Sequence, residues 1–451
     1  MEINGKRVLC CGMAKSGIAA AHLAKQKGAL VTLQDYKKKE TLDASLLKQL
    51  REEGIELYLG QNPDEIVAEQ DLIIVSPGIP TDLPFFARAK EAGVPIISEV
   101  EFAYWYTPCP VVAITGTNGK TTTTALTGEL LKAKYPGVAV VGNIGVPYAA
   151  EVSRLTKDDY VVAEISSFQM ETADTFHPHI AAVLNITPDH LDRHKTLENY
   201  IAMKERIFRR QDAQDFLILN ASDPVTLAMA KKSKAKPVFF SSQAPLEEGI
   251  FLQQGHIILS KEGSQTDLID VKECQLLGVH NYENMMAAVA MALCAGVDVE
   301  QIRQGLRQFR GVAHRIEYVR TVDGVDYYND SKGTNVDAAI RGILAMEKPC
   351  VLLGGGYDKG AEYDSWLELF DGRVKKLILL GQTAQKIAAC CDRHGFTAYE
   401  FAQTFDEALQ KAKQAAQQGD CVLLSPACAS WGMFDNYEQR GDLFKAWVRA
   451  L

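Results

Sequence analysis

The sequence has no apolar run that could span a bilayer. Its most apolar stretch, Met285–Val297, is shorter than the roughly 18 residues that a membrane-spanning helix requires. A secretory signal is also missing, because the charges near the start run directly into the strand-like Val8–Cys11 without a longer apolar segment. We therefore expect a cytoplasmic protein that makes no contact with membranes.

An excess of basic charge is missing as well. The chain has 48 lysines and arginines against 57 aspartates and glutamates, for a formal net charge of −9. This balance provides no global field that would attract nucleic acid, so we expect small-molecule partners. A local basic pocket that binds a phosphorylated compound is compatible with this net charge. For the oligomeric state, we expect a monomer.

The ten cysteines include no C-x-x-C pair. Their spacing therefore excludes a zinc ribbon and a thioredoxin motif. Most of them lie in apolar strand or helix segments, which predicts reduced, buried thiols in a reducing compartment. Cys428 follows Ser425-Pro426 but has no histidine near it in the sequence, which disfavours a nucleophilic role.

The length of 451 residues suggests about three domains. Hydrophobic residues make up 47% and charged residues 23%, a balance typical of folded globular proteins. No internal repeat and no low-complexity linker is visible. We expect an N-terminal domain over residues 1–107, a central domain over 108–311 and a C-terminal domain over 312–451.

Short apolar runs that end at a glycine or a small polar residue, and lead into a helical period, recur along the chain. The runs are Arg7–Gly12, Asp71–Gly78, Val111–Gly116, Tyr160–Ser167, Ile180–Thr187, Phe216–Asn220, Cys350–Gly356, Leu377–Gly381 and Cys421–Ser425. Such runs suit strands buried on both faces, and their repetition with helices predicts an α/β fold with parallel sheets. Ligands bind beyond the carboxyl ends of these strands. Ser241–Glu273, rich in glycine and polar residues, predicts hairpins or long loops.

The strongest chemical signal follows the strand-like Val111–Ile114. The chain continues Gly116-Thr117-Asn118-Gly119-Lys120-Thr121-Thr122 and then shows leucines at helical spacing. This order predicts a phosphate loop, in which backbone N–H groups surround phosphate oxygens, Lys120 reaches the β- and γ-phosphates and Thr121 ligates Mg²⁺. The spacing departs from G-x-x-x-x-G-K-[ST], since Ile114 stands at the first glycine position. An ordinary strand–helix turn is the alternative.

Other polar candidates follow in the same block. Glu164 ends an apolar run and is a candidate Mg²⁺ ligand, or else a solvated strand-end or capping residue. His190 ends the next run, where it could lie beside a nucleotide-bound metal, on the surface or at a helix cap. His190 and His194 stand four apart as in a zinc pair, but no H-E-x-x-H arrangement and no third ligand is evident. On its own, Lys204 is interpreted as a lysine on a solvated helix face.

The first block contains a glycine loop of a different kind. Gly12-Met13-Ala14-Lys15-Ser16-Gly17 follows a strand and opens a helix, so its N–H groups suit a diphosphate. Ala14 replaces the second glycine of G-x-G-x-x-G, which counts against a dinucleotide site and against a nicotinamide oxidoreductase. Asp35 lies about 20 residues further on, where a hydrogen bond to a ribose or a base is expected. A plain tight turn is the alternative for this loop.

Together these motifs resemble the Mur ligase family of ATP-dependent amide-bond ligases, over essentially the whole chain. The segments that carry the resemblance are Gly116–Thr121, Glu164–Gln169, Asn185–Asp192, Lys204, His280-Asn281-x-x-Asn284, His314-Arg315 and Asn329–Asn335. The resemblance implies three domains: a Rossmann-like N-terminal domain, a central P-loop ATPase-type domain with a parallel sheet, and a Rossmann-like C-terminal domain.

Three further segments narrow the resemblance to the members that add D-glutamate. They are Ser76–Pro80, Ser425–Trp431 and Asn436–Gly441. The implied reaction joins D-glutamate to UDP-N-acetylmuramoyl-L-alanine through an acyl phosphate, with ATP converted to ADP and phosphate, in peptidoglycan precursor synthesis. Another amino-acid specificity within the family is one alternative. A nucleotide-gated interaction protein, in which the phosphate loop drives a switch without ligation, is another.

The resemblance also implies roles for residues of the central and C-terminal blocks. ATP would be bound by Gly116, Thr117, Asn118, Gly119, Lys120, Thr121, Thr122, Asn281, Arg315 and Asp330. Two Mg²⁺ ions would be held by Thr121, Glu164, His190 and Lys204. Lys204 would be carbamylated by CO₂, which turns a cation into an anionic oxygen ligand for a hard metal and so reverses its interpretation as a solvated lysine.

The remaining implied roles concern the two other substrates. The UDP substrate would be bound by Lys15, Ser16, Asp35, Tyr36, Ser76, Gly78, Asn143, Ser166 and Gln169. D-Glutamate would be bound by Lys332, Thr334, Ser430, Trp431 and Tyr437. The residues expected to act in catalysis are Lys120, His190, Lys204, Lys332 and Lys359.

Overall fold

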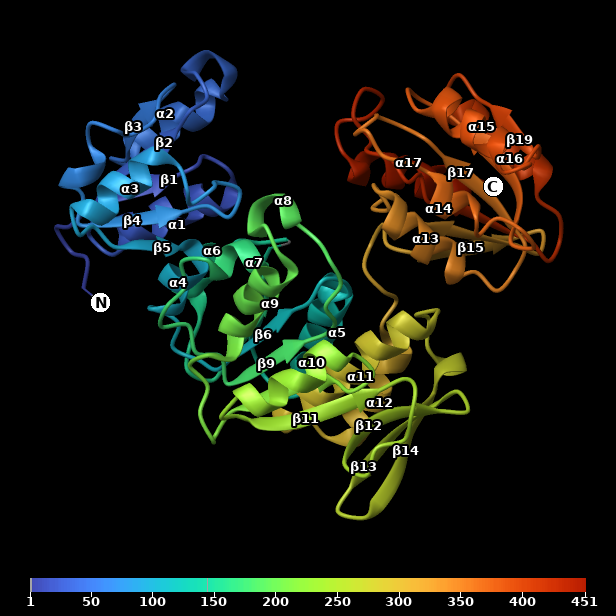
Figure 1. Ribbon diagram of the computed structural model, residues 1–451, viewed down its shortest axis with the longest axis horizontal. Coiled ribbons are helices and arrows are strands. Elements are labelled where there is room, and N and C mark those ends of the chain that lie inside the picture. The colour runs from blue at the N-terminus through green and yellow to red at the C-terminus, as the bar shows by residue number, and fades with distance from the viewer. Residues whose placement is uncertain (1, 144) are drawn as a thin grey trace. The chain divides into compact units, whose positions relative to one another are not determined.

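The computed structural model describes residues 2–143 and 145–451. These residues form three β-sheets that succeed one another along the chain, coloured from blue through green and yellow to red in Figure 1. They group into two compact units. One unit holds the residues up to Asp270 together with Glu283–Leu306, and the other holds Val271–Tyr282 together with Arg307–Leu451. The expected α/β class with parallel sheets is confirmed, whereas the domain boundaries at residues 107 and 311 stay predictions.

The first sheet is parallel throughout and has the strand order β3-β2-β1-β4-β5. Its strands are β1 (Arg7–Cys11), β2 (Leu30–Asp35), β3 (Glu56–Leu59), β4 (Leu72–Val75) and β5 (Ile96–Ser98). Its helices are α1 (Lys15–Gln26), α2 (Ala44–Glu52), α3 (Pro84–Glu91) and α4 (Glu99–Tyr104). The strand order reverses beside β1, so the residues that follow β1, β2 and β4 meet at one edge of the sheet.

The second sheet has the order β14-β13-β12-β11-β10-β9-β6-β8-β7. Its strands are β6 (Val111–Thr115), β7 (Val138–Gly142), β8 (Tyr160–Glu164), β9 (Ile180–Val183), β10 (Phe216–Asn220), β11 (Lys236–Ser241), β12 (Gly249–Gln253), β13 (His256–Lys261) and β14 (Ser264–Asp270). The strands from β6 to β12 pair in parallel. The hairpins predicted within Ser241–Glu273 are confirmed, because β13 pairs antiparallel with both β12 and β14.

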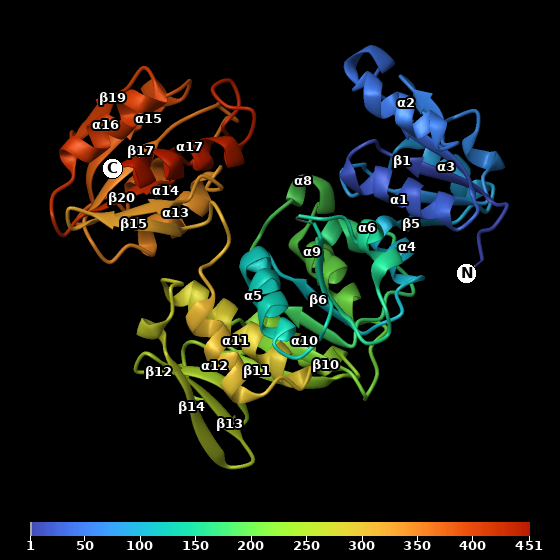
Figure 2. The same cartoon turned by 180° about the vertical axis from the view of Figure 1, so that it is seen from behind.

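The helices that accompany the second sheet are short except for α5 and α11. They are α5 (Lys120–Lys132), α6 (Tyr148–Glu151), α7 (Ser167–Met170), α8 (Leu191–His194), α9 (Leu197–Glu205), α10 (Pro224–Met229), α11 (Val279–Cys294) and α12 (Val299–Gln308). Figure 2 shows α5 beside β6, from which the chain enters it. Among the described residues, no helix has both the length and the apolarity to cross a bilayer.

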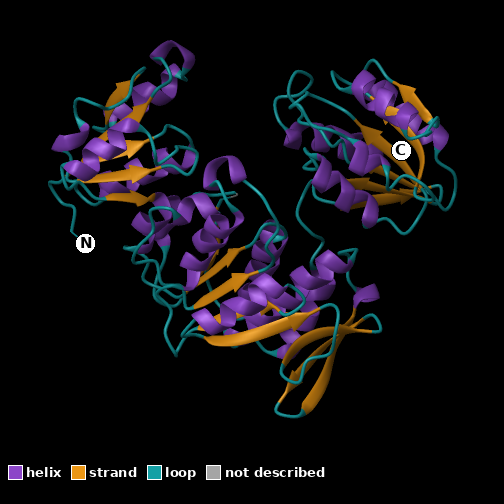
Figure 3. Cartoon of the chain, in the orientation of Figure 1, coloured by secondary structure: helices purple, strands orange, loops and turns teal. Residues whose placement is uncertain are grey.

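The third sheet has the order β15-β16-β20-β17-β18-β19 and is parallel except for the β15–β16 pair. Its strands are β15 (Glu317–Val322), β16 (Val325–Asn329), β17 (Cys350–Gly354), β18 (Val374–Leu379), β19 (Tyr399–Phe401) and β20 (Cys421–Leu424). Its helices are α13 (Val336–Leu344), α14 (Asp364–Leu367), α15 (Ala384–Arg393), α16 (Phe405–Ala415) and α17 (Tyr437–Ala450). Figure 3 shows helices flanking its strands.

Burial explains why the strands are apolar without alternation. Leu352 and Leu353, neighbours in β17, belong to two different cores, one on each face of the third sheet. Each predicted apolar run overlaps a strand, namely β1, β4, β6, β8, β9, β10, β17, β18 and β20, and β18 begins three residues before its run. The ten cysteines are free thiols, and all but Cys294 are buried.

The first two sheets share one hydrophobic core. Val8 of β1 and Val111 of β6 belong to the same buried cluster, which continues through Phe102 of α4 and Tyr148 of α6. Burial of large apolar side chains across this junction stabilises one arrangement of the two sheets. This continuity explains why both sheets lie in a single compact unit.

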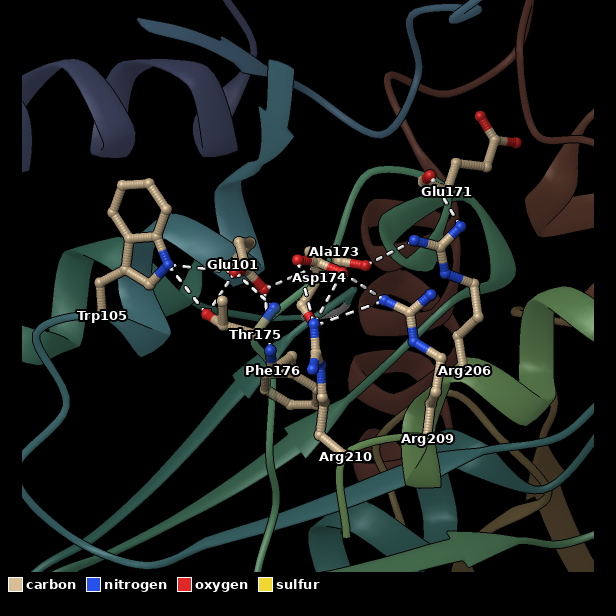
Figure 4. A network of polar contacts seen from close by, with 10 residues as sticks. All are labelled: Glu101, Trp105, Glu171, Ala173, Asp174, Thr175, Phe176, Arg206, Arg209 and Arg210. Carbon is tan, nitrogen blue, oxygen red and sulfur yellow. Dashed lines mark hydrogen bonds and ion pairs between the residues drawn. The ribbon is translucent and has the colours of Figure 1, made fainter. Parts of the chain in front are cut away.

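A buried carboxylate fixes α4 to the loop before β9. Glu101 is fully buried and accepts backbone hydrogen bonds from Asp174 (3.1 Å), Thr175 (2.8 Å) and Phe176 (3.0 Å). The indole of Trp105 also donates to it, at 3.0 Å, as Figure 4 shows. A carboxylate has lone pairs enough for several donors, so one side chain satisfies three successive N–H groups.

Replacing Glu101 with alanine is expected to lower the free energy of unfolding by about 3 kcal/mol or more, because buried N–H donors lose their acceptor. Glu101→Gln keeps one acceptor oxygen and is expected to cost less. Urea denaturation measures both losses. Glu91→Ala, at an exposed position ending α3, is the matched control. Equal denaturation midpoints for Glu101→Ala and the control would contradict the assignment.

Candidate functional site

The predicted phosphate loop joins β6 to α5 at the carboxyl end of the second sheet. Gly119 has a φ of 82°, and a Cβ there would stand 2.1 Å from Oδ1 of Asn284, so the loop needs glycine at this point. Lys120 opens α5, and its Nζ donates to the carbonyl oxygens of Gly116 (2.9 Å) and Thr117 (2.8 Å). The ammonium group therefore lies against the loop whose N–H groups and helix dipole favour an anion.

Residues that follow β9 form hydrogen bonds with the phosphate loop. Oδ1 of Asn185 accepts from the N–H of Asn118 at 2.8 Å, and the hydroxyl of Thr117 donates to the carbonyl of Thr187 at 3.0 Å. Because β6 and β9 are neighbouring parallel strands, their following loops meet at the same edge. The phosphate loop is thus held from one side by a second loop.

A buried carboxylate lies on the other side of the loop. Glu164 ends β8, is 2% exposed, and its Oε2 accepts from the Thr121 hydroxyl at 3.0 Å. Its Oε1 accepts from Nδ2 of Asn143 at 3.1 Å. The carboxylate and hydroxyl oxygens are donors of the kind that Mg²⁺ prefers, and their proximity fits the predicted role of Thr121 and Glu164 in holding that ion. Thr122, the next residue of α5, is buried in the helix.

Lys204 is not on a solvated face. Its side chain in α9 is 2% exposed, and its Nζ donates to the carbonyl of Gly116 at 2.8 Å. Burial, together with the nearby Lys120 charge, holds the pKa of Lys204 well below its usual value. The interpretation from the residue alone was wrong, because helical spacing cannot reveal that α9 turns this position toward the phosphate loop.

His190 stands at the N-terminus of α8 in a left-handed conformation, with a φ of 52°. Its ring is half exposed and packs 4.8 Å from the ring of Phe168, centroid to centroid. His194 is buried and its Nε2 lies 2.9 Å from the hydroxyl of Ser167. The zinc alternative gains no support: among the described residues, the groups of three possible ligand side chains lie elsewhere and contain neither histidine.

A cavity of about 840 Å³ opens at the carboxyl edge of the first sheet. Of the residues predicted to bind the UDP substrate, it is lined by Ser16, Asp35, Tyr36, Ser76 and Gly78. Oδ2 of Asp35 accepts from the N–H of Met13 at 2.8 Å, and its Oδ1 accepts from that of Lys37 at 3.0 Å. The carboxylate thereby joins the glycine loop after β1 to the turn after β2.

The other residues predicted for the UDP substrate lie outside this cavity. Lys15 lines a separate cavity between α1 and α6. Ser166 and Gln169 form the capping box of α7, in which the Ser166 hydroxyl accepts from the N–H of Gln169 at 3.3 Å. Asn143 contacts Glu164, as described above. The structure thus distributes the predicted set over four places.

In the second unit, three residues predicted to bind nucleotide belong to one body, because Val271–Tyr282 packs with the C-terminal sheet. Asn281 is 7% exposed and its Nδ2 donates to the carbonyl of Leu277 at 2.7 Å. Asp330 follows β16, and its Oδ2 accepts from the Ser425 hydroxyl at 2.7 Å. Burial raises the pKa of Asp330 to about 7, against the nearby charge of Arg315.

Three residues predicted to bind D-glutamate and the predicted catalytic residue Lys359 form two lysine–aromatic pairs. Nζ of Lys332 lies 5.6 Å from the ring centre of Tyr437, and Nζ of Lys359 lies 5.2 Å from that of Trp431. The N–H of Thr334 donates to the carbonyl of Lys332 at 2.8 Å. Ser430 is 4% exposed, whereas Trp431 is half exposed. Lys332 is partly buried and Lys359 is exposed, and cations beside polar loops suit an anionic amino acid.

Three family models match the chain in succession. The Mur ligase MurD-like N-terminal domain matches residues 6–98, the Mur ligase middle domain residues 114–292, and the Mur ligase glutamate ligase domain residues 314–428. The UDP-N-acetylmuramoylalanine–D-glutamate ligase of Lachnoclostridium phytofermentans is 47% identical over 451 residues, which cover 100% of this chain and 99% of the relative. The chain belongs to the Mur ligase family.

Other Mur ligases agree with this assignment. The UDP-N-acetylmuramoylalanine–D-glutamate ligase of Thermoanaerobacter sp. strain X514 is 45% identical, with 100% of both chains covered. The solved structure of UDP-N-acetylmuramate–alanine ligase from Thermotoga maritima has a TM-score of 0.60 at 19% identity, with 99% of both chains covered. That structure supports the fold alone. The nicotinamide oxidoreductase is dismissed, since the first sheet belongs to a Mur ligase domain.

Two arginines of this Mur ligase were not predicted as site residues. Arg440 is 2% exposed, and its guanidinium donates to the Ser331 hydroxyl at 2.9 Å and to the carbonyl of Cys428 at 3.3 Å. It thereby joins the loops after β16 and β20. Arg193, beside His190, is considered below. Neither arginine stands in a local pattern that predicts a contact so distant in the sequence.

Proposed function

We propose that the protein joins the amine of D-glutamate to the alanyl carboxyl group of UDP-N-acetylmuramoyl-L-alanine, with ATP converted to ADP and phosphate. The relatives named as D-glutamate ligases support this substrate pair. The observation that carries the proposal is that two polar contacts lie at one glycine loop. Lys120 donates to the carbonyl of Gly116, and the Thr121 hydroxyl donates to Glu164. We place the reaction in cytoplasmic peptidoglycan precursor synthesis and expect the enzyme to act as a monomer.

A carboxylate is a poor electrophile, so the reaction needs activation of the alanyl carboxyl group. ATP transfers its γ-phosphoryl group to a carboxylate oxygen, and the amine of D-glutamate then attacks the acyl phosphate. The attacking nitrogen loses a proton, the C–O bond to phosphate breaks so that phosphate leaves the tetrahedral intermediate, and the amide remains. Lys120 neutralises negative charge on the transferring phosphoryl group. This stabilises the transition state of phosphoryl transfer and so lowers its activation barrier.

Two Mg²⁺ ions fit the oxygen and imidazole donors beside the loop. Thr121 and Glu164 would hold one ion, and His190 with a carbamylated Lys204 would hold the other. Bound there, the ions supply positive charge that binds and orients the phosphates of ATP. Carbamylation needs an unprotonated amine, which attacks CO₂, forms the N–C bond and releases one proton. The lowered pKa of Lys204 supports this modification.

The roles of the other predicted residues follow the cavities and pairs described above. Asp35, Ser76 and their neighbours would bind the UDP end at the first sheet. Gly116–Thr122, Asn281, Arg315 and Asp330 would bind ATP. The pairs Lys332–Tyr437 and Lys359–Trp431, with Thr334 and Ser430, would bind D-glutamate. Substrates held by different parts of the chain favour closure of the enzyme, which would exclude water from the acyl phosphate.

Phosphate release from ATP tests the proposal directly. UDP-N-acetylmuramoyl-L-alanine is supplied with D-glutamate, L-lysine, meso-diaminopimelate or L-alanine in turn. We expect release with D-glutamate alone and a product heavier by one glutamyl residue. Release with a different amino acid would keep the family and overturn the specificity. Release that is indifferent to all four would instead support a nucleotide-driven switch.

Replacing Asp35 with alanine is expected to raise KM for UDP-N-acetylmuramoyl-L-alanine about tenfold or more, with little change in kcat. The carboxylate fixes two backbone segments of the cavity, so its loss weakens ground-state and transition-state binding alike. Initial rates at varied substrate concentration measure the effect. Glu65→Ala, at an exposed position of the same part of the chain, is the control. An unchanged KM for Asp35→Ala would place the UDP end elsewhere.

A further inference from the structure

The side chain of Arg193 links three parts of the first unit. Its Nε and Nη2 donate to the two carboxylate oxygens of Glu171, at 2.8 and 2.7 Å. Its Nη1 donates to the carbonyl of Pro77 at 3.2 Å, and its Nη2 donates to that of Ile79 at 3.1 Å. The side chains of Arg193 and Glu171 are only 18% and 12% exposed. A side-on, charge-assisted pair between side chains of such low solvent exposure has a well-defined geometry.

The carbonyls that Arg193 binds belong to a wall of the cavity at the first sheet. Pro77 and Ile79 both line that cavity, together with Ser76 and Gly78. The Thr81 hydroxyl donates to Oε2 of Glu171 at 3.0 Å, which ties the end of the same loop to the same carboxylate. Arg193 and Glu171 therefore fix both ends of the short backbone stretch that forms this wall.

The other side of Arg193 faces the phosphate-loop site. Its guanidinium carbon lies 4.3 Å from the ring centre of Phe168, whose ring packs against those of His190 and His194. The ring of His194 packs in turn 5.4 Å from that of Tyr200, whose hydroxyl lies 3.2 Å from the Thr117 hydroxyl. A chain of packed rings thus runs from Arg193 to the phosphate loop.

Glu171 is itself held firmly. Arg206 lies two residues after Lys204 in the chain. Its guanidinium donates to the carbonyls of Glu171 (3.2 Å) and Ala173 (2.6 Å). Figure 4 shows this arginine beside the Asp174–Phe176 segment that Glu101 binds. The backbone segment that begins at Glu171 is therefore anchored to α4 through Glu101 and to the residue after α9, Arg206.

We propose that Arg193 is a positioning residue that fixes the Pro77–Ile79 wall of the cavity relative to His190 and the phosphate loop. The inference rests on the proposed function, because it takes the cavity as the UDP site and the loop as the ATP site. The alanyl carboxyl group must reach the γ-phosphate while its UDP end stays bound far from it. A rigid link between the Pro77–Ile79 wall and the phosphate loop determines how close the alanyl carboxyl group comes to the γ-phosphate. Misplacement of the reacting groups by about 1 Å can cost a hundredfold in rate.

Only arginine satisfies these contacts together. The planar guanidinium meets a carboxylate side-on while its remaining N–H groups reach two carbonyls and its face lies on an aromatic ring. Lysine keeps the charge but presents a single nitrogen, so it cannot hold Glu171 and both carbonyls in one geometry. Arg193→Lys therefore separates positioning from charge.

The test compares Arg193→Lys with Arg209→Lys, since Arg209 makes an exposed ion pair with Asp174 in the same region. For Arg193→Lys we expect the Kd for UDP and the KM for UDP-N-acetylmuramoyl-L-alanine to rise about tenfold, kcat to fall, and KM for ATP to stay within about twofold. Titration calorimetry measures the Kd, and phosphate release measures the rest. Arg209→Lys should match the wild type.

A second variant keeps the proposal testable if Arg193→Lys folds poorly. Glu171→Gln retains the side-chain shape and should show the same pattern in weaker form. The double variant should be no worse than Arg193→Lys, because both residues act through one contact. Wild-type UDP affinity and KM in the variants, or an equal rise of KM for every substrate, would overturn the positioning role. A wild-type protein that neither binds UDP nor releases phosphate would instead overturn the proposed function.

Discussion

Replacing Lys120 with methionine is expected to lower kcat for phosphate release on the order of a thousandfold. The Lys120 ammonium lies at the start of α5, held by the carbonyls of Gly116 and Thr117 at 2.9 and 2.8 Å. These carbonyls hold the cation over the loop, so it is positioned where charge develops on the transferring phosphoryl group. Methionine keeps much of the apolar length of the side chain and removes that charge.

The matched control is Lys132→Met, in the last turn of the same helix, where the side chain is exposed and pairs with Glu129. Its kcat should equal that of the wild type. UDP affinity should be unchanged in both variants, because the cavity proposed to bind UDP lies at the first sheet. A Lys120→Met enzyme that retains most of its kcat would show that this lysine does not touch the phosphates.

The sequence predicts the strands of this fold because their signals are local. An apolar run such as Phe216–Asn220 is buried on both faces of a sheet, and its bounds match those of β10. The glycine loop before α5 is likewise a local pattern, because Gly119 needs a positive φ and Lys120 follows at once. The three-residue strands β5 and β19 are not predictable in this way, because so short a segment carries little periodicity.

The site is less predictable from the sequence because its contacts are distant in the chain. Lys204 is buried only because α9 packs beside the phosphate loop, and no spacing within α9 reveals this. Arg193 meets carbonyls of Pro77 and Ile79, 116 and 114 residues away. By contrast, the Ser166–Gln169 capping box is a local S-x-x-Q pattern, which predicts partners for both side chains within α7.

Lys204 gives the second large expected effect. Lys204→Ala should lower kcat on the order of a hundredfold or more, because an anionic ligand position beside the phosphate loop is lost. Lys204→Arg should lose as much, since a guanidinium stays charged and cannot react with CO₂. Phosphate release measures both variants. Lys231→Arg, at an exposed position of the same unit, is the control and should retain wild-type activity.

The pH and CO₂ dependence of the wild type distinguishes a carbamate from a plain lysine. Burial and the charge of Lys120 lower the pKa of Lys204, so its amine is neutral over a wider pH range than an exposed lysine. Carbamate formation consumes neutral amine and releases a proton. Activity that depends on the carbamate should therefore fall as pH drops through the lowered pKa, and should recover when bicarbonate is added at constant pH.

Carbon-13 bicarbonate provides the direct readout. A carbamate at Lys204 should give one NMR signal in the wild type that disappears in Lys204→Arg and persists in Lys231→Arg. Removal of dissolved CO₂ should lower wild-type activity and leave the already low activity of Lys204→Ala unchanged. If the wild type is fully active without CO₂ and shows no such signal, the buried amine serves as a neutral hydrogen-bond donor to Gly116. Its low pKa would then reflect only burial and the charge of Lys120, and the second metal position would lack its anionic ligand.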